Sequence, residues 1–142
     1  MEKPIEIVVL DDSREDRELI SFELKALGYE AIEVDPNEDV FEKLRQANTD
    51  ILLIDFHMGI FTAFDIIKQK QVYKKYKHIV ICSGGYLTLD DLRKYGLDDS
   101  RFAFIDKNDI KRGLTDYVSR FDTGGIEPDS LYSQGLPQIA EN

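Results

Sequence analysis

Five short, almost wholly apolar runs recur along this 142-residue chain, and longer amphipathic segments separate them. Runs of this kind, rich in β-branched residues, are typical of strands buried on both faces of a parallel sheet. Strands that alternate with helical segments predict five βα units and an α/β sheet. The expected strands cover residues 5–10, 31–34, 51–54, 79–82 and 102–105.

The segments between the strands carry apolar residues at helical spacing. The first segment indicates an amphipathic helix before the stop signal Gly28, with an apolar face made of Leu19, Phe22, Ala26 and Leu27. Further helices are expected near residues 40–47, 62–73 and 88–95. A last helix near residues 110–121 has the clearest stripe, made of Ile110, Leu114, Tyr117, Val118 and Phe121.

The helical pattern stops after Phe121. Glycine and proline punctuate the remaining segment, which has no usable periodicity. We therefore expect one domain over residues 1–121 and a flexible C-terminal tail or linker over residues 122–142.

The chain is acidic, with a formal net charge of −10. This charge repels polyanions, so binding to nucleic acid or to an anionic membrane is disfavoured, and a protein partner or a cation fits better. No run approaches the ~20 apolar residues of a transmembrane helix, and we expect a soluble cytoplasmic protein. The only cysteine, Cys82, excludes an intrachain disulfide and is typical of a buried small side chain.

Polar side chains follow the apolar runs where the predicted strands end. In open α/β sheets the carboxyl ends of the strands form the binding crevice, so these side chains are expected to converge. Clustered carboxylates repel one another unless a divalent cation lies among them, and Mg²⁺ prefers carboxylates together with phosphate oxygens and water. The strand-end residues are Asp11, Asp12, Asp55, Ser83 and Lys107. They predict phosphoryl chemistry on an aspartate.

Each of these residues has a chemical role in such a site. Asp55 is the candidate nucleophile, because a carboxylate can form an aspartyl phosphate. The Asp11-Asp12 pair would hold Mg²⁺ with Asp55, and the backbone carbonyl of His57 is within loop reach of the ion. Lys107 would contact a phosphoryl oxygen as a point charge, and Ser83 would donate a hydrogen bond to another oxygen.

Taken one at a time, these residues also have purely structural explanations. Asp11-Asp12 suit a strand end or a helix N-cap, Lys107 suits solvent, and Ser83 suits a turn before Gly84-Gly85. The joint pattern is improbable on that explanation, because residues of the required types follow strands one, three, four and five in the required order.

These landmarks, with Gly28-Tyr29 after the first helix and Phe104 before the lysine, resemble the receiver domain of two-component response regulators over about residues 5–121. The resemblance implies a flavodoxin-like, doubly wound, five-stranded parallel sheet of order 2-1-3-4-5. It also implies Mg²⁺ at Asp11-Asp12 and Asp55, and phosphoryl transfer onto Asp55 from a sensor histidine kinase or a histidine phosphotransfer protein.

The resemblance further implies an output. Ser83 would act as a switch hydroxyl and Phe104 as the aromatic that rotates inward when Ser83 moves. Phosphorylation would then change a face that binds a downstream protein, so the chain would be a phosphoacceptor with self-catalysed phosphorylation and dephosphorylation, not a turnover enzyme.

The chain departs from the family pattern in three loops. Asn108 follows the lysine where the family often has proline, which disfavours a cis peptide because a cis bond before a non-proline residue costs about 3 kcal/mol. Gly84-Gly85 replace bulkier residues, and Phe56-His57-Met58-Gly59 lacks the usual proline. The His57 side chain either has no role beyond its backbone or modulates the lifetime of the phosphoaspartate.

Two other functions compete with phosphoacceptor signalling. The first is an adaptor that uses a receiver fold without being phosphorylated. The second is a phosphatase of the haloacid dehalogenase type, which also combines an aspartate, a hydroxyl, a lysine and Mg²⁺. Such phosphatases need a second acid two residues after the nucleophile, where this chain has His57.

Overall fold

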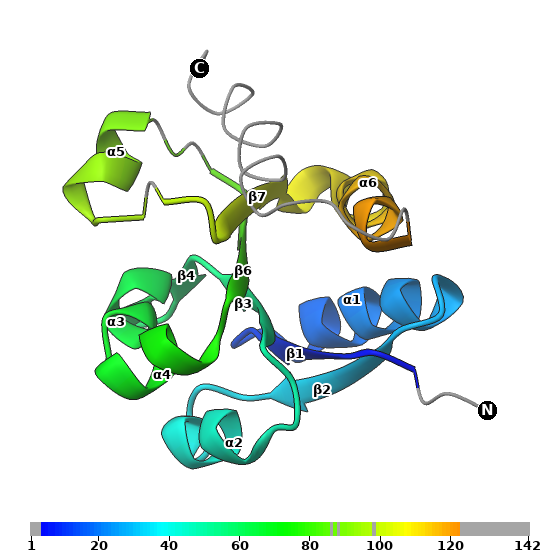
Figure 1. Cartoon of the computed structure of the whole chain (residues 1–142), viewed down its shortest axis with the longest axis horizontal. Coiled ribbons are helices and arrows are strands. Elements are labelled where there is room, and N and C mark those ends of the chain that lie inside the picture. The colour runs from blue at the N-terminus through cyan, green and yellow to red at the C-terminus, as the bar shows by residue number, and fades with distance from the viewer. Residues whose placement is uncertain (1–3, 86, 88, 98, 123–142) are drawn as a thin grey trace.

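The computed structural model describes residues 4–85, 87, 89–97 and 99–122. Five parallel strands form one sheet in the order β2-β1-β3-β6-β7 (Figure 1). Numbered by βα unit, this is the order 2-1-3-4-5, so the predicted doubly wound sheet is confirmed. The strands are β1 (Glu6–Leu10), β2 (Glu30–Val34), β3 (Ile51–Asp55), β6 (His78–Ser83) and β7 (Phe102–Asp106).

Helices cover both faces of the sheet, which is why its inner strands are apolar on both sides. Along β1, Val8 and Leu10 join one core cluster with residues of α2, α3, α4 and α5, whereas Ile7 and Val9 join a second cluster with residues of α1 and α6. The helices are α1 (Arg14–Ala26), α2 (Val40–Gln46), α3 (Ala63–Ile67), α4 (Lys70–Lys75), α5 (Leu89–Lys94) and α6 (Ile110–Asp122). None of these described helices is long and apolar enough to cross a membrane.

The apolar face predicted for α1 is wrong at Leu19 and Phe22, whereas Leu27 does pack against the core. Leu19 and Phe22 are 49% and 61% exposed, whereas Ile20 and Leu24 are 1% and 0% exposed and pack into the core. The helix carries a second set of apolar residues at i, i+4 and i+7, namely Ile20, Leu24 and Leu27. This set faces the sheet, so helical periodicity alone could not choose between the two.

The third βα unit is more elaborate than the single loop and helix predicted over residues 62–73. Two short strands, β4 (His57–Met58) and β5 (Phe61–Thr62), form a hairpin with Gly59 and Ile60 as its two-residue turn. Gly59 has a φ of +67°, and positive φ at the first turn residue alone is the geometry of a type II′ hairpin. The sequence signal for the hairpin was therefore this glycine.

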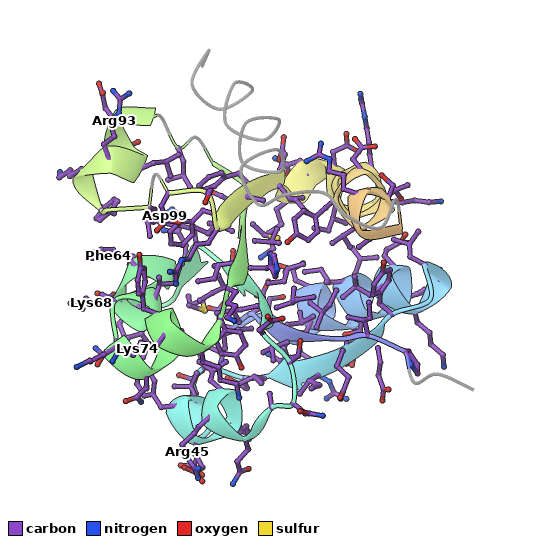
Figure 2. The ribbon with its side chains drawn as sticks, in the orientation of Figure 1. Arg45, Phe64, Lys68, Lys74, Arg93 and Asp99 are labelled. Carbon is purple, nitrogen blue, oxygen red and sulfur yellow. The ribbon has the colours of Figure 1, made fainter. Side chains whose placement is uncertain are left out.

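Helix α3 ends early, and α4 begins after a break at Gln69, whose backbone is extended. The lysine-rich segment 74–77 contains the end of α4 and a core residue. Tyr76 is 0% exposed, and its hydroxyl donates to the carbonyl oxygen of Leu44 at 2.6 Å. Lys68 and Lys74 do remain on the outer side of this pair of helices (Figure 2).

Helix α6 confirms the stripe predicted for it, because Ile110, Leu114, Tyr117 and Val118 are buried against the sheet. The side chain of Phe121 lies outside the described part of the chain. Gly113 allows this helix to approach β7, since a Cβ there would overlap Cγ2 of Ile105. The helix ends at Asp122, and the rest of the expected tail, with Thr88 of the fourth expected helix, lies outside the described residues.

Candidate functional site

Three carboxylates meet at the carboxyl ends of β1 and β3. Asp11 and Asp12 directly follow β1, and Asp55 is the last residue of β3. One oxygen from each side chain lies within 4.8 Å of the other two. Asp11 and Asp55 are 1% and 6% exposed, whereas Asp12 is exposed to solvent. The predicted convergence of these acids is therefore present in the folded chain.

Lys107 places a positive charge in this acidic group. It begins the 3₁₀ helix η1 (Lys107–Asp109) that follows β7. Its ammonium nitrogen lies 2.8 Å from Oδ2 of Asp11, 2.8 Å from Oδ2 of Asp16 and 3.2 Å from Oδ1 of Asp55. Asp16 was not among the predicted site residues. It is the third residue after the N-cap of α1, a position where an acidic side chain favours the start of a helix.

The burial of these groups changes their protonation equilibria. Desolvation, together with the negative charge of Asp11, raises the pKa of Asp55 to about 6 although Lys107 opposes the rise. Desolvation also raises the pKa of Asp11, again against the effect of Lys107. Burial would lower the pKa of Lys107, but its bonds to Asp11 and Asp16 and the charges of Asp11 and Asp55 raise that pKa overall. The burial of Asp11 and Asp55 thus disfavours their charged forms even with Lys107 beside them.

The donor set fits a hard divalent cation. Oδ2 of Asp11 is fully buried, and the ammonium of Lys107 lies 2.8 Å from it. Three neighbouring carboxylates, two of them buried, offer the oxygen ligands that Mg²⁺ prefers. Asp11, Asp12 and Asp55 could therefore hold a metal ion.

Ser83, the last residue of β6, is buried beside the acidic group at the same edge of the sheet. Its Oγ accepts a hydrogen bond from the Gly85 amide at 3.1 Å and donates to the Gly85 carbonyl at 3.2 Å. A Cβ at Gly84 would meet nothing within 4 Å, so the loop leaves this side of the edge open.

The predicted switch aromatic, Phe104, is half-buried on β7 and packs against the core cluster on the α2 to α5 side. Asn108, the residue after Lys107, connects η1 to the loop after β6, because its side-chain amide donates to the Gly84 carbonyl at 3.3 Å. No described peptide bond is cis, so the bond between Lys107 and Asn108 is trans.

Comparisons with known proteins agree with this architecture. No protein-family model matches the chain. Over 79 residues, 54% of this chain, the sequence is 32% identical to chemotaxis protein CheY1 of Helicobacter pylori, and the match spans 64% of that relative's length. The receiver domain of hybrid histidine kinase CckA is similar in structure, with a TM-score of 0.61 and 19% identity over 80% of this chain and 95% of that domain. The chain has the CheY-like receiver fold.

A second similar structure with the receiver fold is a complex with a ligand. Response regulator protein TrrA of Thermotoga maritima, solved in complex with Mg(2+)-BeF, has a TM-score of 0.66 and 23% identity over 81% of this chain and 96% of that protein. The carboxylate group of the present chain thus stands in a fold that occurs with this metal and phosphoryl mimic in another protein.

His57 lies in the hairpin that follows Asp55 in this receiver fold. It pairs with Thr62 across the two short strands, and its side chain is exposed and packs edge-on against Phe56 with 4.8 Å between ring centroids. The hairpin therefore holds the His57 backbone, while the imidazole faces solvent.

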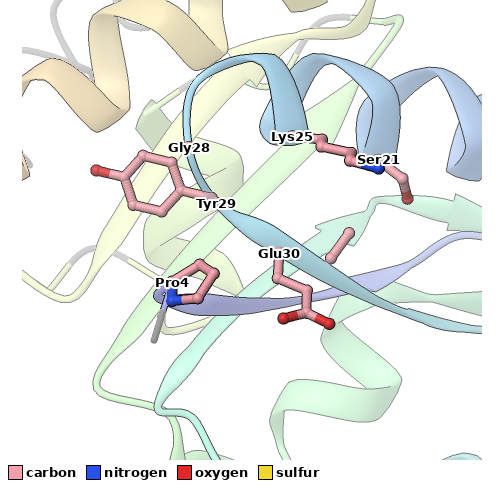
Figure 3. A pocket seen from close by; sticks show the side chains of 7 residues that line it. Pro4, Ser21, Lys25, Gly28, Tyr29 and Glu30 are labelled. Carbon is pink, nitrogen blue, oxygen red and sulfur yellow. The ribbon is translucent and has the colours of Figure 1, made fainter. Parts of the chain in front are cut away.

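A cavity of about 390 Å³ lies at the opposite end of the sheet (Figure 3). Pro4, before β1, and Glu30, the first residue of β2, line it together with Ser21, Lys25, Gly28, Tyr29 and Ala31. None of the predicted site residues lines this cavity, so it is separate from the acidic group at the strand ends.

Proposed function

We propose that this chain is a phosphoacceptor of two-component signalling, in which a phosphoryl group passes from a phosphohistidine to Asp55 with Mg²⁺ bound. The observation that carries this proposal is the group of Asp11, Asp12 and Asp55 carboxylates within 4.8 Å of one another, with the ammonium of Lys107 3.2 Å from Asp55. A nucleophilic carboxylate, a metal-ligand set and a cation are the parts that aspartyl phosphorylation needs.

The residues divide the chemistry between them. An oxygen of Asp55 forms the new bond to phosphorus while the phosphorus–nitrogen bond of the donor breaks and the donor imidazole leaves. Asp11-Asp12, Asp55 and the backbone carbonyl of His57 would hold Mg²⁺, which neutralises charge on the phosphoryl oxygens when bound. Lys107 contacts one of those oxygens and Ser83 donates to another, so catalysis is positioning and electrostatic stabilisation.

The donor in this proposal is a sensor histidine kinase or a histidine phosphotransfer protein. The similarity to a receiver domain from a hybrid histidine kinase supports this choice. The output is a contact with a downstream protein, and the net charge of −10 disfavours a nucleic-acid ligand.

The switch in this proposal is the Ser83 hydroxyl. Its bonds to Gly85 are both local to one turn, so its hydroxyl can turn to a phosphoryl oxygen without breaking the sheet. Phe104 on the neighbouring strand then changes its packing. In this proposal the exposed imidazole of His57 modulates how fast water removes the phosphoryl group.

Intact-mass spectrometry after incubation with acetyl phosphate tests the proposal. With Mg²⁺ present we expect one phosphoryl adduct per chain in the wild type and in Asp109→Asn, an exposed acid outside the carboxylate group. We expect none in Asp55→Asn and none when EDTA removes the metal. An unchanged adduct in Asp55→Asn would refute the assignment of the nucleophile.

The same protein separates the competing functions. Sustained release of phosphate from a phosphate monoester would favour a phosphatase, and we expect none. A folded wild-type chain that binds neither Mg²⁺ nor beryllofluoride and takes up no phosphoryl group would favour an adaptor that is not phosphorylated.

A further inference from the structure

Helices α1 and α3 begin with the same sequence motif, a hydroxyl residue followed three positions later by aspartate. At α3, Thr62 and Asp65 form a complete capping box. The Thr62 hydroxyl accepts from the Asp65 amide at 3.4 Å, and Oδ2 of Asp65 accepts from the Thr62 amide at 2.9 Å. Both side chains are thus engaged in starting the helix.

At α1 only one of the two hydrogen bonds of the capping box forms. The Ser13 hydroxyl accepts from the Asp16 amide at 3.3 Å, but the Ser13 amide donates to Oδ1 of Asp11 at 2.8 Å instead of to Asp16. The Asp16 carboxylate is therefore not needed for the cap. It reaches across the strand ends to the ammonium of Lys107 at 2.8 Å.

Asp16 differs from the other two carboxylates that Lys107 contacts. Asp11 and Asp55 belong to the group that could hold a metal, and Asp55 is the proposed phosphoacceptor, whereas Asp16 is not in that group. A lysine ammonium has three N–H donors, and each can be directed at one of these carboxylates. Asp16 is the one contact of the three that neither a metal nor a phosphoryl group would take over.

We propose that Asp16 is a positioning residue that anchors Lys107 while the phosphoryl group arrives at Asp55, an inference that rests on the proposed function. With Asp11 and Asp55 engaged elsewhere, the lysine keeps Asp16 and turns its remaining donors to phosphoryl oxygens. Without the anchor, the long flexible side chain of Lys107 would have to be ordered when the ligand binds, which costs affinity.

Binding of Mg²⁺ and of beryllofluoride, a phosphoryl mimic, measured separately by calorimetry on the full chain, distinguishes positioning from a simple loss of charge. The matched control is Glu15→Gln, which removes the same charge from an exposed residue of the same helical turn. In Asp16→Asn we expect Mg²⁺ affinity to fall no further than in the control. We expect beryllofluoride affinity in the presence of Mg²⁺ to be roughly three- to tenfold lower than in the control, which is the scale of one partly exposed charge-assisted contact.

A second measurement reports on the lysine itself. In ¹⁵N spectra of labelled protein, an ammonium held by carboxylates exchanges its protons slowly with water, and Lys107→Arg identifies its signal. With Mg²⁺ bound, so that Asp11 and Asp55 are engaged by the metal, we expect that signal in the wild type and in Glu15→Gln and its loss by fast exchange in Asp16→Asn. Asp16→Glu, which restores the carboxylate on a longer stem, is expected to recover part of the beryllofluoride affinity.

The outcomes separate the two levels of inference. Equal beryllofluoride affinities in Asp16→Asn and Glu15→Gln, with a wild type that binds the mimic, would overturn the role of Asp16 and leave the proposed function standing. A folded wild type that does not bind the mimic would overturn the proposed function and with it this role.

Discussion

Helices α1 and α6 are each 13 residues long and pack together on one face of the sheet, yet only one of them could be oriented from its sequence. In α6 the predicted stripe is the buried face, as Leu114 and Val118 illustrate. In α1 the predicted stripe, with Leu19 and Phe22, faces solvent while Ile20 and Leu24 fill the core.

The orientation of α1 follows from its polar contacts at the strand ends. The guanidinium of Arg17 donates to the carbonyl oxygen of Asp11 at 2.6 Å, and Asp16 pairs with Lys107. Ile20 and Leu24 lie three and seven residues after Arg17, so they share its side of the helix. The polar contacts with the site and the apolar contacts with the core therefore fix the same rotation of α1.

The largest expected effect is at Leu24, which decides between the two faces of α1. Leu24→Ala should lower the free energy of unfolding by about 2–5 kcal/mol, because it removes a fully buried side chain and leaves a cavity. Leu19→Ala, the control on the exposed stripe, should change it by about 0.5 kcal/mol or less. Urea unfolding of both variants measures this, and the reverse order of costs would show that α1 is rotated.

The next effect concerns the close contact of α6 with β7. Gly113→Ala should destabilise the fold by about 1–3 kcal/mol, because the added methyl group overlaps Ile105 and the gain in helix propensity only partly offsets this. Thr115→Ala, at an exposed position of the same helix, serves as the control.

A double-mutant cycle attributes the cost of Gly113→Ala to the overlap. In that background, Ile105→Ala should cost less than in the wild type, because it removes the overlapping carbon as well as a buried side chain. If the two costs add without coupling, α6 has more room at Gly113 than this packing implies.

The carboxylate group at the ends of β1 and β3 should give an effect of intermediate size that depends on pH. Asp55 has a pKa of about 6 in the folded chain against an ordinary value of 3.8, so the folded state binds its proton more tightly than the unfolded state does. Stability without metal should therefore fall as pH rises from about 4 to 6, since the native state then binds more protons than the unfolded one.

Replacing the Asp55 carboxylate with a neutral amide tests this pH dependence of stability directly. At pH 7 in EDTA, Asp55→Asn should raise the free energy of unfolding by about 1–3 kcal/mol, and the gain should shrink as pH falls below 6. Mg²⁺ should stabilise the wild type but not this variant. A variant that is less stable than the wild type at pH 7 would mean that the Lys107 contact outweighs the burial of the Asp55 charge.

The five βα units and the convergence of the strand-end residues could be predicted because each depends on local sequence and on rules that parallel sheets share, whereas the strand order came from the resemblance to receiver domains. Asp55 after Ile51–Ile54 is an example, since a buried strand can end at a carboxylate only at the sheet edge. The hairpin around Gly59 was missed because its strands have two residues each, too few to show a period of two. Asp16 was missed because a carboxylate in the first turn of a helix usually accepts a hydrogen bond from the N-cap amide. Here that amide, of Ser13, donates to Asp11 instead, so Asp16 is available to pair with Lys107.

The smallest expected effect is at Phe22, which belongs to the apolar face predicted for α1 but is 61% exposed. Phe22→Ala should change the free energy of unfolding by about 0.5 kcal/mol or less, because the loss of partial burial is offset by the higher helix propensity of alanine. Ile20→Ala, two positions earlier and 1% exposed, should cost about 2–4 kcal/mol under the same conditions. An aromatic ring is ordinarily the costliest side chain to remove from a helix, so a near-zero value at Phe22 beside a large one at Ile20 fixes the orientation of α1. Equal costs at both positions would require Phe22 to be covered in solution, by a second copy of the chain or by a partner, and dilution of the protein would then lower the cost at Phe22 alone.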